Sequence, residues 1–132
     1  MKPISSNVSK GCPVGTYVRC IDNTGADIIQ IIAVKGFKGV KRRRAECGVA
    51  GPFVGAVKKG DPKIKHEVVQ CVLVRQKKPW RRPNGMRIMF EDNAAVLINE
   101  RSEPRGTRLK GPIAREVVER FSAIGKIAST VV

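Results

Sequence analysis

Lysines and arginines gather in three runs of this chain, and their side chains are the groups that bind phosphate. A guanidinium donates paired hydrogen bonds to phosphate oxygens, and an ammonium supplies a point charge. The first basic cluster consists of Lys35, Lys38, Lys41, Arg42, Arg43 and Arg44. The second basic cluster consists of Lys77, Lys78, Trp80, Arg81 and Arg82. The third basic cluster consists of Arg101, Arg105, Arg108 and Lys110. These residue types predict binding to a polyanion.

The overall charge supports that interpretation. The 132 residues include 26 Lys and Arg against 11 Asp and Glu, for a formal net charge of +15. A single charged run most often serves only solubility on a solvated face. Three runs together with this net charge favour a nucleic acid, with RNA as the first candidate, and contacts to its backbone rather than to base sequence.

Trp80 is the single tryptophan, and it lies inside the second basic cluster. An exposed indole can stack on an RNA base, whereas a lone tryptophan is commonly packed against its own protein. Both alternatives remain open from the sequence.

The sequence offers no convincing metal site and no cofactor site. Cys12, Cys20, Cys47 and Cys71 are irregularly spaced without a Cys-x-x-Cys pair, and His66 is the only histidine. Zinc sites need closely spaced ligands, so no structural zinc is expected. An even number of cysteines would permit two disulfides, but disulfides are rare in a reducing compartment, so we expect four free thiols, with Cys20 and Cys71 in the core. Residues 1–10 lack the apolar stretch of a secretory signal, which agrees with a reducing compartment.

An enzyme is not expected. His66 and Glu67 could act as a base, but no matched nucleophile is evident, and we expect a surface histidine. Gly48–Pro52 lacks the Gly-Lys-Ser/Thr ending of a phosphate-binding loop. A membrane span is not expected either, because the apolar stretch Ile28–Val34 is far shorter than the ~20 residues required.

The first half of the chain has the pattern of a small, mainly β fold. Val14–Ile21 and Asp27–Lys35 are predicted strands, joined as a hairpin by the turn Asp22–Gly25. Glycines punctuate the stretch Gly48–Val57, as is typical of bends where a sheet closes on itself. Val68–Val74 is almost continuously apolar, which predicts a strand buried on both faces. These features make a barrel plausible.

The second half predicts a projecting hairpin and a short helical end. Gln76–Arg82 and Met86–Phe90 flank the turn Pro83–Gly85, and Ala94–Asn99 supplies another strand. Pro112 suits the first turn of a helix, so we expect helical structure to begin there.

We therefore expect one domain in three parts. Residues 1–13 form an N-terminal extension, residues 14–110 the barrel and hairpin, and residues 111–132 a helical C-terminal region. Gly125 is expected to weaken or bend the last helix.

Several ordered motifs with matching spacing resemble the universal large-subunit ribosomal protein fourteen family, most closely its archaeal and eukaryotic members. They are Asp22-Asn23-Thr24-Gly25-Ala26; Val72 to Lys78 leading to Arg81-Arg82; Asn84-Gly85 with Phe90, Asn93, Val96 and Leu97; Gly106-Thr107-Arg108; and Gly111 to Glu116. Cys71 departs from the family's alanine or glycine, and Gln76 from its hydroxyl residue.

The resemblance implies a closed five-stranded barrel with a projecting β-hairpin and short C-terminal helices. It also implies a structural, cytoplasmic role in the large ribosomal subunit, with large-subunit rRNA and neighbouring ribosomal proteins as partners. By motif position Arg108 is implied in an intersubunit bridge to small-subunit rRNA, with Arg105 and Lys110 less directly, and the C-terminal helices in docking of an anti-association factor.

A free-standing barrel that binds RNA or single-stranded DNA is the main competing hypothesis. Such modules usually present several aromatic side chains on a strand face for base stacking. Aromatic residues make up only 5% of this chain, which argues against that alternative.

Overall fold

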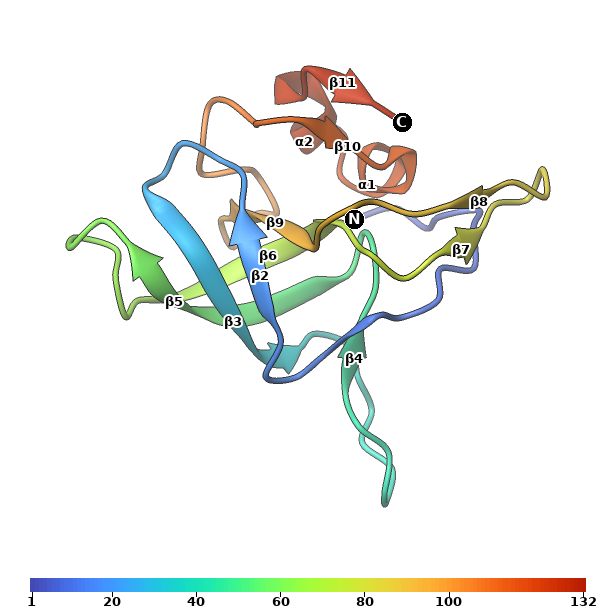
Figure 1. Cartoon of the computed structure of the whole chain (residues 1–132), viewed down its shortest axis with the longest axis horizontal. Coiled ribbons are helices and arrows are strands. Elements are labelled where there is room, and N and C mark those ends of the chain that lie inside the picture. The colour runs from blue at the N-terminus through green and yellow to red at the C-terminus, as the bar shows by residue number, and fades with distance from the viewer.

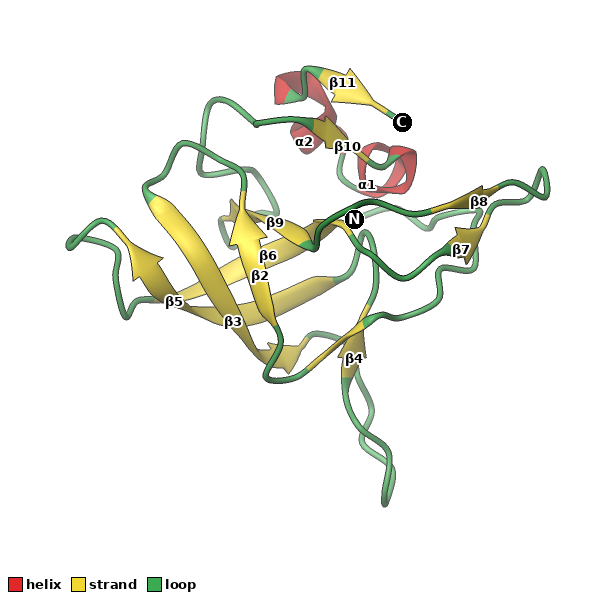
Figure 2. Ribbon diagram, viewed as in Figure 1, coloured by secondary structure: helices red, strands yellow, loops and turns green.

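The computed structural model describes all 132 residues, which form a β-barrel with extensions (Figures 1 and 2). Its elements are β1 (Cys12–Pro13), β2 (Tyr17–Cys20), β3 (Ala26–Val34), β4 (Glu46–Cys47), β5 (Pro52–Gly60), β6 (Val68–Arg75), β7 (Trp80–Arg81), β8 (Arg87–Ile88), β9 (Ala94–Ile98), β10 (Pro112–Ile113), α1 (Arg115–Arg120), α2 (Ser122–Ile127) and β11 (Thr130–Val131). Neither helix is long and apolar enough to cross a membrane.

Five strands close the barrel in the order β2-β3-β5-β6-β9, as the resemblance implied. Neighbouring strands are antiparallel except β2 and β9, which pair in parallel and complete the circle. Register shifts along β3 let it bend around the interior. A Cβ at Gly55 would lie 3.0 Å from the carbonyl oxygen of Gln30, so β5 needs glycine there to approach β3.

Two apolar cores share strands β6 and β9. The barrel interior contains Phe53, Leu73 and Leu97, whereas Val72 and Val96 point outward to a second core beneath the C-terminal helices. β6 is therefore buried on both faces, as its continuous apolar sequence predicted. The covering helices explain how an antiparallel strand can carry this pattern.

The β7–β8 hairpin projects beside the barrel and is anchored by a buried ionic network (Figure 1). Trp80 is fully buried, stacks on Phe90, and donates its indole N–H to Glu116 Oε1 at 3.1 Å. Arg82 is also buried and donates from Nε to Glu116 Oε1 at 2.8 Å and from Nη2 to Oε2 at 3.1 Å. The same Nη2 reaches the carbonyl oxygen of Val132 at 2.7 Å.

This network decides between the two alternatives for Trp80 and corrects the expectation for Arg82, both of which belong to the second basic cluster. Trp80 packs within the protein, so its ring is not exposed for stacking on RNA. Arg82 neutralises a buried carboxylate instead of reaching the surface. The partner of both side chains is Glu116, 34 residues beyond Arg82, which a local charge run cannot indicate.

The C-terminal region also differs from prediction. Pro112 belongs to strand β10, which pairs in parallel with β11, and helix α1 begins only at Arg115. The break between the two helices falls at Phe121, not at Gly125. A long-range interaction outcompetes helix formation at Pro112. Strand β11 pairs with β10, and the amide of Val132 donates to the carbonyl of Ile113 at 2.9 Å.

The first predicted strand is shorter than expected. β2 begins at Tyr17 because Gly15, with φ of +94°, turns the chain before it. The hairpin from β2 to β3 around residues 22–25 is confirmed.

Replacing Glu116 with Gln should lower the free energy of unfolding by about 3–5 kcal/mol, because it leaves the Arg82 charge buried without its counter-ion. Urea denaturation measures the change. Glu119→Gln is the matched control on the same helix, since Glu119 is exposed and has only a 3.5 Å contact with Ser5 Oγ. A comparable change in the two variants would contradict this role for the ion pair.

The same carboxylate should give the fold a dependence on acid. Burial alone raises the pKa of Glu116, but hydrogen bonds from Arg82 and Trp80 outweigh it and hold the pKa below its ordinary value of 4.5. A lowered folded-state pKa stabilises the protein above the ordinary value, and the stabilisation disappears as the pH falls through the folded-state pKa. Stability curves below pH 4.5 should accordingly be flatter for the Glu116→Gln variant than for the parent protein.

Candidate nucleic-acid interface

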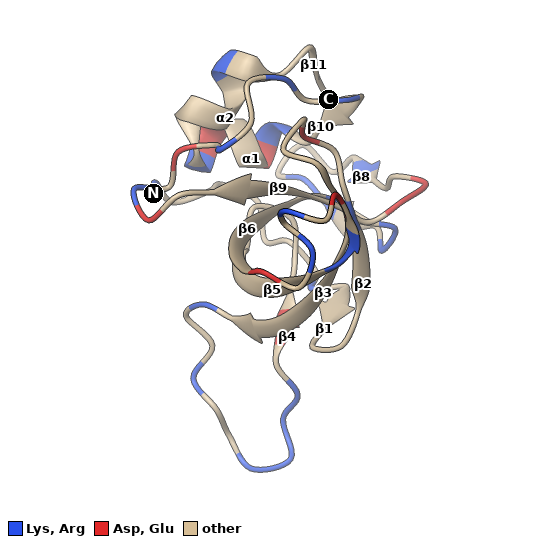
Figure 3. Ribbon diagram, turned by 90° about the vertical axis from the view of Figure 1, so that its left-hand side faces the viewer, with Lys and Arg blue, Asp and Glu red and all other residues tan.

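The first basic cluster lies on a long loop between β3 and β4, and Figure 3 shows this loop extending away from the barrel. All six of its bases are exposed. Lys35 Nζ donates to Gln70 Oε1 at 2.5 Å, and Arg44 donates to the carbonyl of Val14 at 3.3 Å. The side chains of the remaining four bases make no hydrogen bond or ion pair within the chain, so their positive charge faces solvent.

The second basic cluster retains three exposed bases: Lys77, Lys78 and Arg81. The structure adds Arg87, which is exposed on β8 and lies directly opposite Arg81 in the hairpin register. Like charges in such a pair repel each other unless an anion lies between them. Sequence analysis missed Arg87, although alternation on both sides of the Pro83–Gly85 turn could have placed it there.

The third basic cluster occupies the segment between β9 and β10, and all four of its bases are exposed. Arg105 forms an ion pair with Glu67 at 3.2 Å, where both side chains are substantially exposed. The side chain of Arg108 makes no hydrogen bond or ion pair. Its backbone, however, is held by the turn between β2 and β3, since Asn23 Oδ1 accepts from the amide of Thr107 at 2.9 Å.

The three clusters do not merge into one patch. In Figure 1 the β3–β4 loop extends below the barrel, the β7–β8 hairpin extends to the right, and the segment before β10 lies at the upper left. The molecule therefore presents positive charge in several directions around a rigid barrel.

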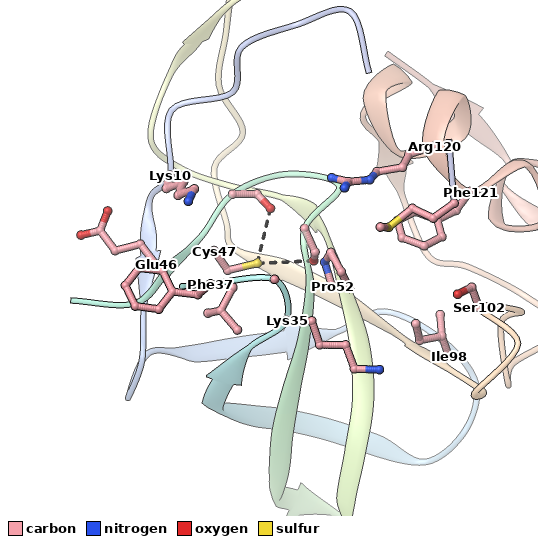
Figure 4. A pocket seen from close by; sticks show the side chains of 15 residues that line it. Lys10, Lys35, Phe37, Glu46, Cys47, Pro52, Ile98, Ser102, Arg120 and Phe121 are labelled. Carbon is pink, nitrogen blue, oxygen red and sulfur yellow. Dashed lines mark hydrogen bonds between the residues drawn. The ribbon is translucent and has the colours of Figure 1, made fainter. Parts of the chain in front are cut away.

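A recess of about 400 Å³ lies where the β3–β4 loop joins the barrel (Figure 4). Lys35 and Phe37 line it from the loop, and Arg120 and Phe121 line it from the end of α1. Three bases and one acid, Glu46, border this recess, so its charge is positive like that of the loop. Sequence reasoning did not single out Phe37 or Arg120, because the contact joins distant segments.

The cysteines and the histidine lie where the sequence analysis expected them. All four cysteines are free and buried, with Cys20 and Cys71 in the barrel interior. His66 is exposed, and its neighbour Glu67 pairs with Arg105.

These features define a small cationic β-barrel protein with exposed basic extensions. Comparison with known proteins is more specific. The family described as "Ribosomal protein L14p/L23e" matches residues 11–132, and the chain belongs to this family. The motif resemblance is thereby confirmed, and the chain is a ribosomal protein rather than an enzyme.

Relatives match over the whole chain. A protein of Methanocorpusculum labreanum and one of Halorubrum lacusprofundi are each 46% identical over 132 residues, covering 100% of both chains. A protein of Methanocella arvoryzae is 42% identical over the same length. All three are named "Large ribosomal subunit protein uL14".

The thiols should be unreactive in the folded protein. Burial raises the pKa of Cys12 to about 11 and that of Cys47 to about 12, and burial together with the charge of Asp22 raises that of Cys20 to about 12. Burial also raises the pKa of Cys71. Because the thiolate is the reactive form, a chromogenic disulfide reagent at pH 8 should modify four thiols only after unfolding in urea. Rapid modification of the native protein would contradict this expectation.

Proposed function

We propose that the chain is a structural constituent of the large ribosomal subunit that binds large-subunit rRNA through its basic extensions. Family membership and the names of its full-length relatives support this role. The observation that carries the RNA contact is the set of exposed, largely unpaired bases on three sides of the barrel. A ribosomal protein of this kind acts in the cytoplasm, within the ribosome.

Electrostatics gives these bases a driving force. Few of them have a partner inside the chain, so the free protein retains strong like-charge repulsion at a net charge of +15. Phosphates of RNA relieve that repulsion and release their own counterions. The facing pair Arg81 and Arg87 is a specific place for a phosphate.

The distribution of aromatic side chains favours folded RNA over a single strand. Tyr17 is the only aromatic residue with an exposed side chain, while Trp80, Phe53 and Phe121 are buried. Modules that bind single strands stack successive bases on several exposed rings. Basic arms pointing in different directions fit phosphates of a folded RNA instead.

The finer contacts form part of the same proposal. Arg108, with Arg105 and Lys110, contacts small-subunit rRNA in an intersubunit bridge, because these side chains are exposed and Arg108 has no internal partner. Bases of the first and second clusters contact large-subunit rRNA or neighbouring ribosomal proteins. Residues 111–132 form the docking region for an anti-association factor. Trp80 and Arg82 take no part in these contacts because they are buried.

Replacing Arg42, Arg43 and Arg44 together with Gln should weaken binding to deproteinised large-subunit rRNA most strongly at low salt. Loss of three phosphate contacts should reduce the slope of log affinity against log salt concentration by about 2–3. Filter-binding titrations over a salt series measure both quantities. The control replaces the exposed Lys58, Lys59 and Lys63 with Gln, which removes the same charge elsewhere. Equal losses in the two triple variants would argue for diffuse attraction instead of contacts by this loop.

Arg108→Glu should impair subunit joining more than assembly of the large subunit. The reversed charge repels small-subunit phosphates but leaves the barrel and the other clusters unchanged. Sucrose gradients at limiting magnesium measure joining, and the amount of the protein in purified large subunits measures assembly. Lys65→Glu, at another exposed base, is the control. Equal defects in joining and assembly would reject Arg108 as a bridge residue.

A further inference from the structure

Asn23 holds the backbone beside Arg108 although the two lie 85 positions apart. Its Oδ1 accepts hydrogen bonds from the amides of Thr107 at 2.9 Å and Arg108 at 3.4 Å. Its Nδ2 donates to Thr107 Oγ1 at 2.9 Å. One amide side chain therefore satisfies two backbone donors and one hydroxyl of the segment that carries the third basic cluster.

The turn that carries Asn23 is itself fixed to the barrel. Asp22 is buried, and its Oδ2 accepts from the amide of Leu97 at 2.9 Å. Its Oδ1 accepts from the amide of Thr24 at 3.2 Å, which shapes the turn. The hydrogen bonds of Asn23 therefore tie the segment before β10 to the β2–β3 turn, and Asp22 ties that turn to strand β9.

Gly106 permits this close contact. A Cβ at Gly106 would lie 2.8 Å from Asn23 Oδ1 and 2.9 Å from the Cβ of Asp22. The buried Asp22 cannot readily retreat, because its carboxylate is held by the amide of Leu97. The segment is also held to the end of β2 beyond Gly106, since the amide of Lys110 donates to the carbonyl of Ile21 at 2.8 Å.

The result is a fixed backbone beneath a free guanidinium. We propose that Asn23 is a positioning residue for Arg108, which it presents to small-subunit rRNA in one backbone conformation. Fixing the backbone before contact removes ordering entropy that binding would otherwise cost. This inference rests on the proposed bridge function of Arg108 and assigns to Asn23 a role that acts through Arg108.

A double-mutant cycle tests the inference in large subunits that carry the full-length protein. The four forms are the parent, Asn23→Ala, Arg108→Gln and the double variant, each assayed for joining to small subunits at limiting magnesium. Asn23→Ala should weaken joining about fivefold, which corresponds to the net free energy of one hydrogen bond. Incorporation of the protein into large subunits should be unchanged. In the Arg108→Gln background it should cause no further loss, because Asn23 acts through Arg108.

Two further variants complete the design. Asn84→Ala removes a comparable local contact at an exposed turn, where Asn84 Oδ1 accepts from the amide of Met86 at 3.0 Å, and it should leave joining unchanged. Thr107→Val removes only the hydroxyl partner of Asn23 and should weaken joining by a smaller factor. If Asn23→Ala fails to assemble, the cycle is built with Thr107→Val.

The possible outcomes separate this inference from the bridge proposal. A joining defect that vanishes in the Arg108→Gln background supports positioning. An equal defect in both backgrounds, or normal joining by Asn23→Ala while Arg108→Gln is impaired, overturns the positioning role and leaves the bridge intact. Normal joining by Arg108→Gln overturns the bridge proposal and this inference together.

Discussion

The buried carboxylate of Glu116 is the interaction on which the arrangement outside the barrel depends. It accepts hydrogen bonds from Trp80 and Arg82 of the hairpin, and from Ser6 near the N-terminus at 3.2 Å. Arg82 extends the network to the carbonyl of Val132. Hairpin, helix α1 and both chain ends therefore meet at one charge, and a buried ion is tolerated only when its partners satisfy it fully. The network thereby joins the hairpin to helix α1.

Two groups of basic residues have different roles in this protein, one in the fold and the other on the surface. Arg82 and Arg75 are buried and paired with Glu116 and Asp92, so they stabilise the fold and add little to the surface charge. The bases of the three clusters, Arg82 apart, are exposed, and few have an internal partner. The barrel thus carries uncompensated charge outward on its extensions. Folded rRNA, with phosphates on several sides, is the partner that such a distribution fits.

Sequence reasoning succeeded where structure depends on neighbouring residues. The hairpin around residues 22–25 follows from turn chemistry, and burial of β6 follows from its continuous apolar run. Exposure of the β3–β4 loop follows from four consecutive bases that cannot be buried. Reasoning failed at Pro112 and left Trp80 undecided, because strand β11 and Glu116 respectively decide their structure from a distance.

The sequence by itself indicated the strands of the barrel, the excess of positive charge and, through its motifs, the ribosomal family. Periodicity, turn residues and charge runs are local properties, because they depend only on residues that are close together in the sequence. Only the tertiary structure decided that Trp80 and Arg82 are buried against Glu116, and that Asn23 supports the backbone of Arg108. Each of these contacts joins segments that are far apart in the sequence, and no local pattern encodes which distant segments meet.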